Sequence, residues 1–132
     1  MRDVNKVMLL GRLGADPVIR ETKNGIPVAT FPVATSSYYE NKTEGEEKGT
    51  THQKTEWHRV VSWGKQGESC ANFLRKGHSV FVEGSIRSSQ YSDKEGISRK
   101  GIEVHADKIS FLKGSAQQKE RIEAHPELEA TG

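Results

Sequence analysis

The order of the patterned segments limits the fold of this chain more than any other feature. Runs with the period of two of a β-strand alternate with turn signals, and a single segment, 65–76, has helical spacing. The predicted strands, of which the first is long and bends at 11–17, cover 4–22, 26–35, 55–63, 79–91 and 100–112. Three strands, a helix and two strands are the elements of a five-stranded OB-fold barrel. We therefore expect an all-β fold with one short helix.

Glycines and phase changes mark where these elements turn. Asn24-Gly25 is a tight-turn signal, residues 92–96 form a second hairpin turn, and Gly77 is placed to end the helix. Gly84 indicates a bulge or sharp bend, and the apolar phase of the last strand slips near Asp107, which indicates another bulge. Residues 36–54 are rich in Glu, Lys, Gly and Thr, so we expect a long solvated hairpin loop there.

Length and composition fit one small domain with a tail. The 132 residues carry a net charge of +2, with a basic excess in the body and an acidic excess after residue 114. We predict a barrel domain over 1–113 and a polar, acidic, flexible tail over 114–132. The moderately basic body permits a nucleic-acid partner without requiring one.

Several classes of site and location receive no support. No run of about 18 apolar residues exists, which excludes a membrane span. The five histidines lack a Cys or His neighbour at a metal-ligand spacing, so we expect no metal and no cofactor. The single cysteine, Cys70, is predicted to be a small buried hydrophobe. The start of the chain lacks a secretion signal, which favours a cytoplasmic location, although a mature organellar protein with its leader removed would look similar.

The segment 55–65 carries the clearest functional signal. In an extended strand its side chains alternate between two faces, and one face holds both tryptophans with an arginine between them. That face consists of Trp57, Arg59, Val61 and Trp63, and the other of His58, Val60 and Ser62. Aromatics interleaved with cations suit single-stranded nucleic acid, whose bases stack and whose phosphates are anionic. A buried sheet face with Arg59 reaching its edge is the alternative, and this segment alone does not separate the two.

Further aromatics and cations lie at predicted strand ends and loops. Tyr38 and Tyr39 open the polar segment, and Tyr91 ends the fourth strand on the side opposite its apolar residues. We favour Tyr39 over Tyr38 as a stacking residue, since Tyr38 can also cap the sheet. His58 points away from the tryptophans, which favours a place in the core or at a subunit contact.

Several motifs together resemble the bacterial-type single-stranded DNA-binding protein family, which has close mitochondrial relatives. The resemblance covers about residues 3–112, in the family's order and spacing. Its motifs are Val4-Asn5-Lys6-Val7, Leu10-Gly11-Arg12-Leu13-Gly14, Asp16-Pro17, Ala34-Thr35-Ser36, Thr55-Glu56-Trp57-His58-Arg59-Val60-Val61, Leu74-Arg75-Lys76-Gly77 and Val82-Glu83-Gly84 with Ile86-Arg87.

The resemblance implies a homotetramer that wraps single-stranded DNA without sequence preference in replication, recombination and repair. It implies that 1–113 is the single-stranded DNA-binding and oligomerisation domain of a nucleoid-associated cytoplasmic protein rather than a mitochondrial one, and it implies no enzymatic activity. Its stacking positions fall on Tyr39, Trp57, Trp63 and Tyr91, and its phosphate contacts on Lys6, Arg59, Lys65, Lys76 and Arg87. The family's subunit-interface histidine falls on His58. Ser89 and Gln90 stand where relatives often have cations, which implies weaker binding near Tyr91.

The end of the chain departs from the family pattern. Bacterial relatives commonly end in an acidic tip closed by an aromatic residue, which recruits replication and repair proteins. Residues 126–132 contain acidic side chains but no such tip, so recruitment by that route is not expected. An OB-fold module for structured RNA or for a protein of replication restart is the alternative function. An enzyme has little support, since Gly11-Arg12-Leu13-Gly14 lacks the spacing of a phosphate-binding loop.

Overall fold

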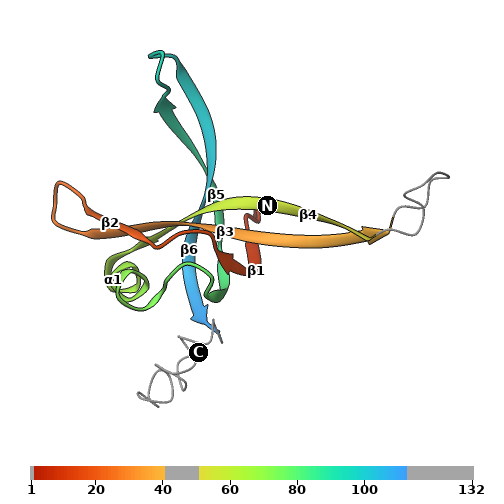
Figure 1. The fold of residues 1–132 in the computed structure, drawn as a ribbon. Coiled ribbons are helices and arrows are strands. Elements are labelled where there is room, and N and C mark those ends of the chain that lie inside the picture. Colours follow the sequence, from red (N-terminus) through yellow and green to blue (C-terminus); the bar gives the residue numbers. More distant parts are fainter. Residues whose placement is uncertain (1, 41–50, 113–132) are drawn as a thin grey trace.

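The computed structural model of the 132-residue chain describes residues 2–40 and 51–112. In chain order, these residues form four strands, one helix and two further strands (Figure 1). The elements are β1 (Val7–Leu13), β2 (Val18–Glu21), β3 (Pro27–Glu40), β4 (Thr51–Trp63), α1 (Gly64–Phe73), β5 (Ser79–Ser92) and β6 (Ser98–Phe111). The predicted order is confirmed, with the first predicted strand divided into β1 and β2.

The strands form one sheet that closes into a barrel. Its strand order is β1-β5-β6-β4-β3-β2, and β1 also pairs with β3. Two of the ladders around the barrel are short. The antiparallel β1–β3 ladder and the parallel β4–β6 ladder have two residue pairs each, whereas β3–β4 and β5–β6 are long hairpins. The five-stranded OB-fold barrel predicted from the sequence is confirmed, with β2 as an added edge strand.

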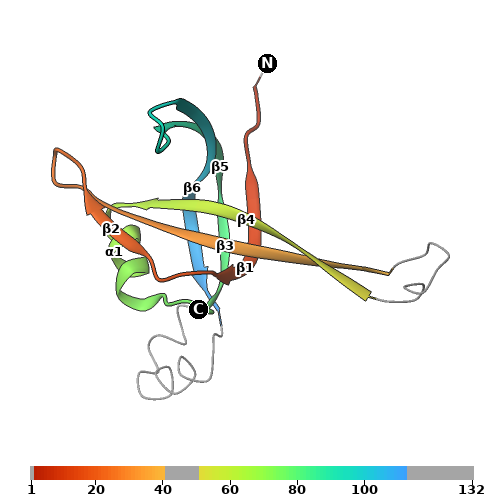
Figure 2. The ribbon, with the colours of Figure 1, turned by 45° about the horizontal axis from the view of Figure 1, so that its top comes forward.

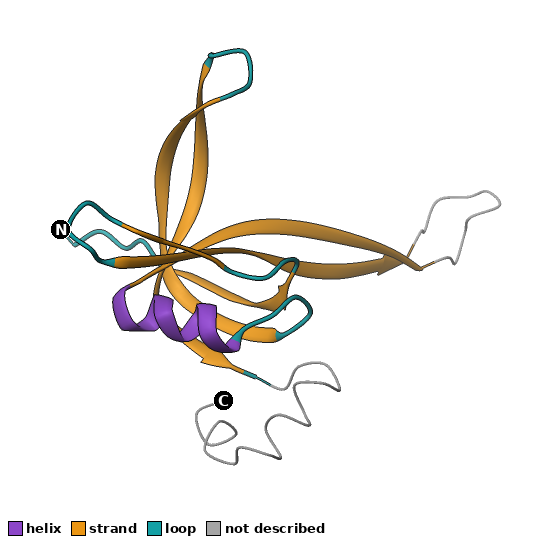
Figure 3. Cartoon of the chain, turned by 60° about the vertical axis from the view of Figure 1, so that its left-hand side comes forward, coloured by secondary structure: helices purple, strands orange, loops and turns teal. Residues whose placement is uncertain are grey.

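The core fills the barrel, and α1 covers one of its ends. Figure 3 shows α1 lying across the lower end of the barrel, near the edge strand β2. Gly67 allows the helix to approach closely, because a Cβ there would lie 2.5 Å from the backbone oxygen of Ser62. The buried core cluster consists of Leu9, Leu13, Ala29, Phe31, Val33, Val60, Cys70, Leu74, Val80, Val82 and Val104. Burial raises the pKa of the Cys70 thiol from 9.0 to about 11, although a hydrogen bond with Ser62 acts in the opposite direction.

Two long ribbons leave the barrel in different directions, as Figures 1 and 2 show. The β3–β4 ribbon occupies much of the segment 36–54 that was predicted to be a loop. That prediction is wrong for 36–40 and 51–54, which are paired strands, while 41–50 lie outside the described residues. Polar cross-strand contacts take the place of a core here. Ser36 Oγ lies 3.2 Å from Thr55 Oγ1 and accepts a hydrogen bond from Gln53 Nε2 at 3.0 Å.

The helix is shorter than predicted, whereas the turns at Asn24-Gly25 and 92–96 are confirmed, and the two predicted bulges, at Gly84 and near Asp107, are a single bulge. Segment 65–76 was predicted to be helical to its end, but α1 stops at Phe73. Leu74 is extended, with φ −85° and ψ 144°, and the backbone N–H of Arg75 donates to His78 Nδ1 at 3.0 Å in place of a helical carbonyl. Gly84 pairs with Ala106 while Glu83 pairs with Lys108, so Asp107 is the extra residue of the predicted bulge.

Within residues 2–40 and 51–112, no helix is long and apolar enough to cross a membrane. The same described residues hold no group of three or more His, Cys, Asp or Glu side chains arranged to bind a metal ion.

Candidate nucleic-acid interface

Both tryptophans lie on the surface of β4. Trp57 is 62% exposed and Trp63 45% exposed, while the alternate residues Val60 and Ser62 are fully buried. The predicted alternation is therefore confirmed, and the buried-face alternative is wrong for both indoles. Val61 shares the outer face but is covered by its neighbours. Arg59 lies between the two aromatics with most of its side chain exposed.

A glycine sets the position of the Trp57 ring. Gly14 follows β1, and its backbone N–H donates to the carbonyl of Pro32 at 3.0 Å. A Cβ on Gly14 would lie 2.2 Å from Cζ3 of Trp57 and 2.7 Å from Cη2. The indole therefore lies directly against the backbone of residue 14, and the absence of a side chain there is what makes room for it.

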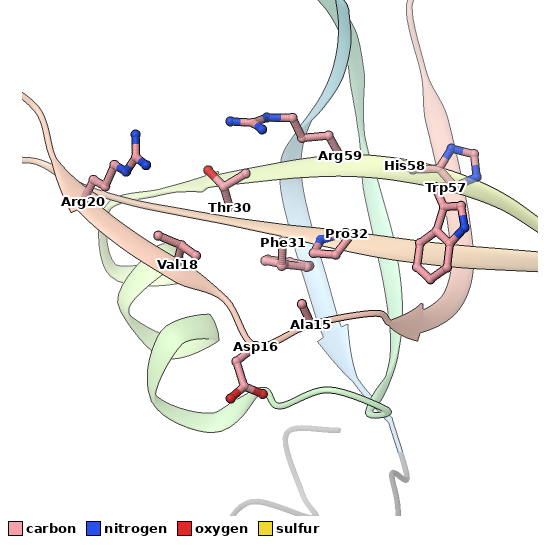
Figure 4. Close-up of a pocket in the computed structure, with 10 residues that line it drawn as sticks. All are labelled: Ala15, Asp16, Val18, Arg20, Thr30, Phe31, Pro32, Trp57, His58 and Arg59. Atoms are coloured by element: carbon pink, nitrogen blue, oxygen red, sulfur yellow. The ribbon is translucent and has the colours of Figure 1, made fainter. Parts of the chain in front are cut away.

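Beside Trp57 the surface is hollowed, with a volume of about 470 Å³. The hollow lies over β2, β3 and β4, as Figure 4 shows, with Trp57 and His58 at one end and Arg20 at the other. Its lining consists of Ala15, Asp16, Val18, Arg20, Thr30, Phe31, Pro32, Trp57, His58 and Arg59. Arg20 was not predicted as a contact. The only sequence signal for it is weak: β2 has four residues, all exposed, and Arg20 shares a face with Val18.

A second hollow, of about 420 Å³, lies on the other side of Arg59. It is lined by Arg59, Ser89, Gln90, Tyr91, Gly101, Ile102 and Glu103. Tyr91 is exposed, and its ring lies near Gly101, where a Cβ would meet Tyr91 Cε1 at 3.3 Å. Arg59 thus borders both hollows and connects the tryptophan strand to Tyr91.

The turn beyond Tyr91 is held by a fixed carboxylate. Asp93 accepts hydrogen bonds from the backbone N–H groups of Glu95 and Ile97 and from the side chain of Arg99. These bonds, the one from Arg99 first, lower the pKa of Asp93 below its usual value. These three hydrogen bonds hold the β5–β6 turn just beyond Tyr91.

Tyr39 lies on the β3–β4 ribbon, away from the two hollows. Its ring stacks on His52, with the centroids 5.4 Å apart and the planes at 24°. The ladder pairs Ala34 with Trp57, so counting by twos along β3 puts Tyr38, rather than Tyr39, on the Trp57 face. Tyr38 is more exposed than Tyr39 and is an aromatic that the sequence prediction passed over. The stacking role of Tyr39 stays a prediction.

The predicted cations are exposed, but they lie on different elements around the tryptophan face. Arg87 on β5 pairs across the ladder with Glu103 on β6, next to Arg59. Lys65 lies in the first turn of α1, after Trp63. Lys6 precedes β1, and Lys76 lies between α1 and β5, where its backbone N–H donates to Asp16 at the first hollow.

His58 lies on the opposite side of β4 from the tryptophans. Its Nε2 is 2.8 Å from Thr35 Oγ1, and the pair is partly buried. The opposite-face placement predicted from the alternation is confirmed, while its contact with a second subunit stays a prediction.

Comparison with known proteins identifies the family of this chain. Residues 4–112 match the single-strand binding protein family. The chain belongs to this family. It is 40% identical over 122 residues to "Single-stranded DNA-binding protein 1" of Xylella fastidiosa strain 9a5c, covering 92% of this chain and 86% of that protein. It is 41% identical over 113 residues to the "Single-stranded DNA-binding protein" of X. fastidiosa strain Temecula1, covering 86% and 66%.

A solved structure supports the fold of this family member. The structure titled "Plasmodium falciparum SSB complex with ssDNA" matches with a TM-score of 0.70 and 28% sequence identity. The match covers 86% of this chain and 98% of the other. Members of this family are DNA-binding proteins rather than enzymes.

Proposed function

We propose that this chain binds single-stranded DNA without sequence preference, in replication, recombination and repair. The observation that carries the proposal is the exposed Trp57–Arg59–Trp63 face of β4, whose Arg59 borders both hollows. Each exposed ring offers a stacking surface worth about 1–3 kcal/mol per base, whatever the base. Family membership and the single-stranded DNA in the matched structure support the same conclusion.

The DNA strand follows the outer face of β4 and continues over Tyr91. Bases stack on Trp57, Trp63 and Tyr91, and Tyr39 on the opposite face of the β3–β4 ribbon is a further surface where the DNA passes round that ribbon. Phosphates meet Arg59 and Arg87, with Lys6, Lys65 and Lys76 around them. Arg20 joins these cations at the far end of the first hollow.

Titration with oligo-dT at low and high salt tests this function. Binding should quench tryptophan emission, because both indoles lie on the proposed path, and its affinity should fall as salt rises. Trp57→Ala and Trp63→Ala should each weaken binding. A control substitution away from both tryptophans, Lys23→Gln in the β2–β3 turn, should not. Absence of quenching, salt-indifferent binding, or preference for duplex DNA or structured RNA would contradict the proposal.

We also propose that the chain assembles with itself, as a homotetramer. Met8 is 62% and Leu10 63% exposed on the outer face of β1, and Val7 and Leu9 face the core cluster. β1 pairs with β3 only at Arg12 and Leu13, so the rest of that strand edge has no partner within the described residues. An open edge beside exposed apolar side chains favours association with another strand. His58 contributes to a subunit contact in this proposal.

Light scattering during size-exclusion chromatography measures the assembly directly. A mass of four chains at micromolar concentration supports the homotetramer, and a monomer there contradicts it. The expectation that replication and repair proteins are not recruited through an acidic tip closed by an aromatic residue concerns residues 114–132, which lie outside the described residues, and it stays a prediction.

A further inference from the structure

A carboxylate lies inside the proposed DNA path. Glu103 on β6 borders the second hollow, together with Tyr91 and Arg59. A negative charge beside a polyanion site repels phosphates unless another group offsets it. The contacts of this side chain show what it does there.

Glu103 is held at both oxygens by groups of the proposed interface. Its Oε2 accepts a hydrogen bond from Arg59 Nε at 2.8 Å, and its Oε1 lies 3.2 Å from His105 Nε2. Its side chain is only 18% exposed. The His105 ring in turn lies 6.1 Å from that of Trp63. The carboxylate is therefore fixed within the surface and does not swing freely into solvent.

The geometry of the ion pair leaves Arg59 able to contact DNA. The bond to Glu103 uses the Nε–H, while the arginine side chain remains 62% exposed. A guanidinium has further N–H donors at its two Nη atoms, which can still donate to a phosphate. What the pair removes is the net positive charge, not the hydrogen-bonding capacity.

We propose that Glu103 sets the salt dependence of DNA binding by neutralising Arg59 in the interface. Counterions are released from DNA in proportion to the positive charge that meets its phosphates. An arginine that is already paired adds little to that release, so its contact with DNA persists as salt rises. Glu103 is thus a positioning residue that lowers affinity at low salt and makes affinity less sensitive to salt.

Because this role rests on the proposed function, wild-type binding to oligo-dT has to be measured first. If the wild-type protein does not bind, the proposed function fails. If it binds, the Glu103 variants test the present proposal separately. The readout is the slope of log affinity against log salt concentration, measured by anisotropy of labelled oligo-dT.

Glu103→Gln keeps an oxygen acceptor for Arg59 but removes the charge. We expect the salt slope to steepen by about 0.7, the value for one further phosphate neutralised on a single strand. We expect affinity at low salt to rise about threefold to tenfold, since a repelling charge is removed. An unchanged slope or weaker binding would overturn the proposal; weaker binding would indicate that the carboxylate accepts hydrogen bonds from bases.

Two further variants separate the ion pair from total charge. Glu56→Gln makes the same charge change on β4, but on the His58 side of the strand, where Glu56 is exposed and pairs with Lys54 at 3.6 Å. This control should leave the slope close to the wild-type value. The double change Arg59→Gln with Glu103→Gln removes a neutral pair and should also keep the wild-type slope. A slope flatter by about 0.7 in the double variant would show that Arg59 acts as a full charge, and would refute the proposal.

Discussion

Replacing Gly14 by alanine would test whether the backbone of residue 14 sets the Trp57 stacking surface. The new Cβ would lie 2.2 Å from Trp57 Cζ3, whereas carbon atoms in contact lie about 3.5–4.0 Å apart, so the ring has to move by more than about 1 Å. Gly14 is not among the glycines with positive φ, and its backbone accepts alanine. Since Trp57 is exposed, the ring can turn outward at little cost to folding.

The expected effect is a selective loss of DNA affinity. Misplacing one stacking surface costs part of the about 1–3 kcal/mol that a stacked base contributes, so we expect binding about fivefold weaker. The free energy of unfolding should change by less than about 1 kcal/mol, because no core residue is displaced. Anisotropy of labelled oligo-dT and urea unfolding followed by circular dichroism measure the two quantities.

A double-mutant cycle isolates the contact between the two residues. With Trp57→Ala already present, Gly14→Ala should cost no further affinity, since the ring it displaces is gone. Equal losses with and without the indole would refute the reasoning. Unchanged affinity in the single variant would refute it as well.

Three further predictions concern other parts of the molecule. The pKa of the Cys70 thiol is about 11 in the folded protein and 9.0 when unfolding exposes it, so between these pH values only the unfolded chain carries the thiolate. The free energy of unfolding should therefore fall across this range by up to about 2–3 kcal/mol. Urea unfolding of Cys70→Ala should lack this part of the pH dependence. Met8→Asp with Leu10→Asp should lower the mass seen by light scattering, and an intact tetramer would contradict the proposed β1 interface. Tyr91→Ala should weaken oligo-dT binding about fivefold or more while Tyr91→Phe keeps the wild-type affinity, and equal losses would show that the hydroxyl rather than the ring matters.

The sequence predicted the features that depend on local periodicity. Alternation along β4 placed Trp57, Arg59 and Trp63 on one face, and the phase slip near Asp107 located the bulge. It failed where polar strands pair with each other, as along 36–40 and 51–54, since composition there indicates a loop. The end of α1 was missed because helical spacing does not reveal the bond that the Arg75 N–H makes to the His78 side chain just past the helix.

The partners of the site residues could not be predicted, because they come from distant parts of the chain. Glu103 meets Arg59 only through the parallel β4–β6 ladder, and Gly14 meets Trp57 only after β1 has joined β3. No spacing in the sequence reveals either contact. Tyr38 and Tyr39 were separable only once the ladder register was known.

The two short ladders of the barrel have a mechanical consequence. They divide the barrel into one antiparallel unit of β2, β3 and β4 and another of β1, β5 and β6, which share only two residue pairs along each boundary. The proposed DNA path crosses the β4–β6 boundary, where the Arg59–Glu103 pair spans it. A DNA strand bound across this boundary would therefore connect two units that are joined there by only two ladder pairs. Because bound DNA opposes separation of the two units, we expect amide exchange at Val60, Val61, Val104 and His105 to slow when DNA binds. Separation of the two units and release of the DNA would then be coupled.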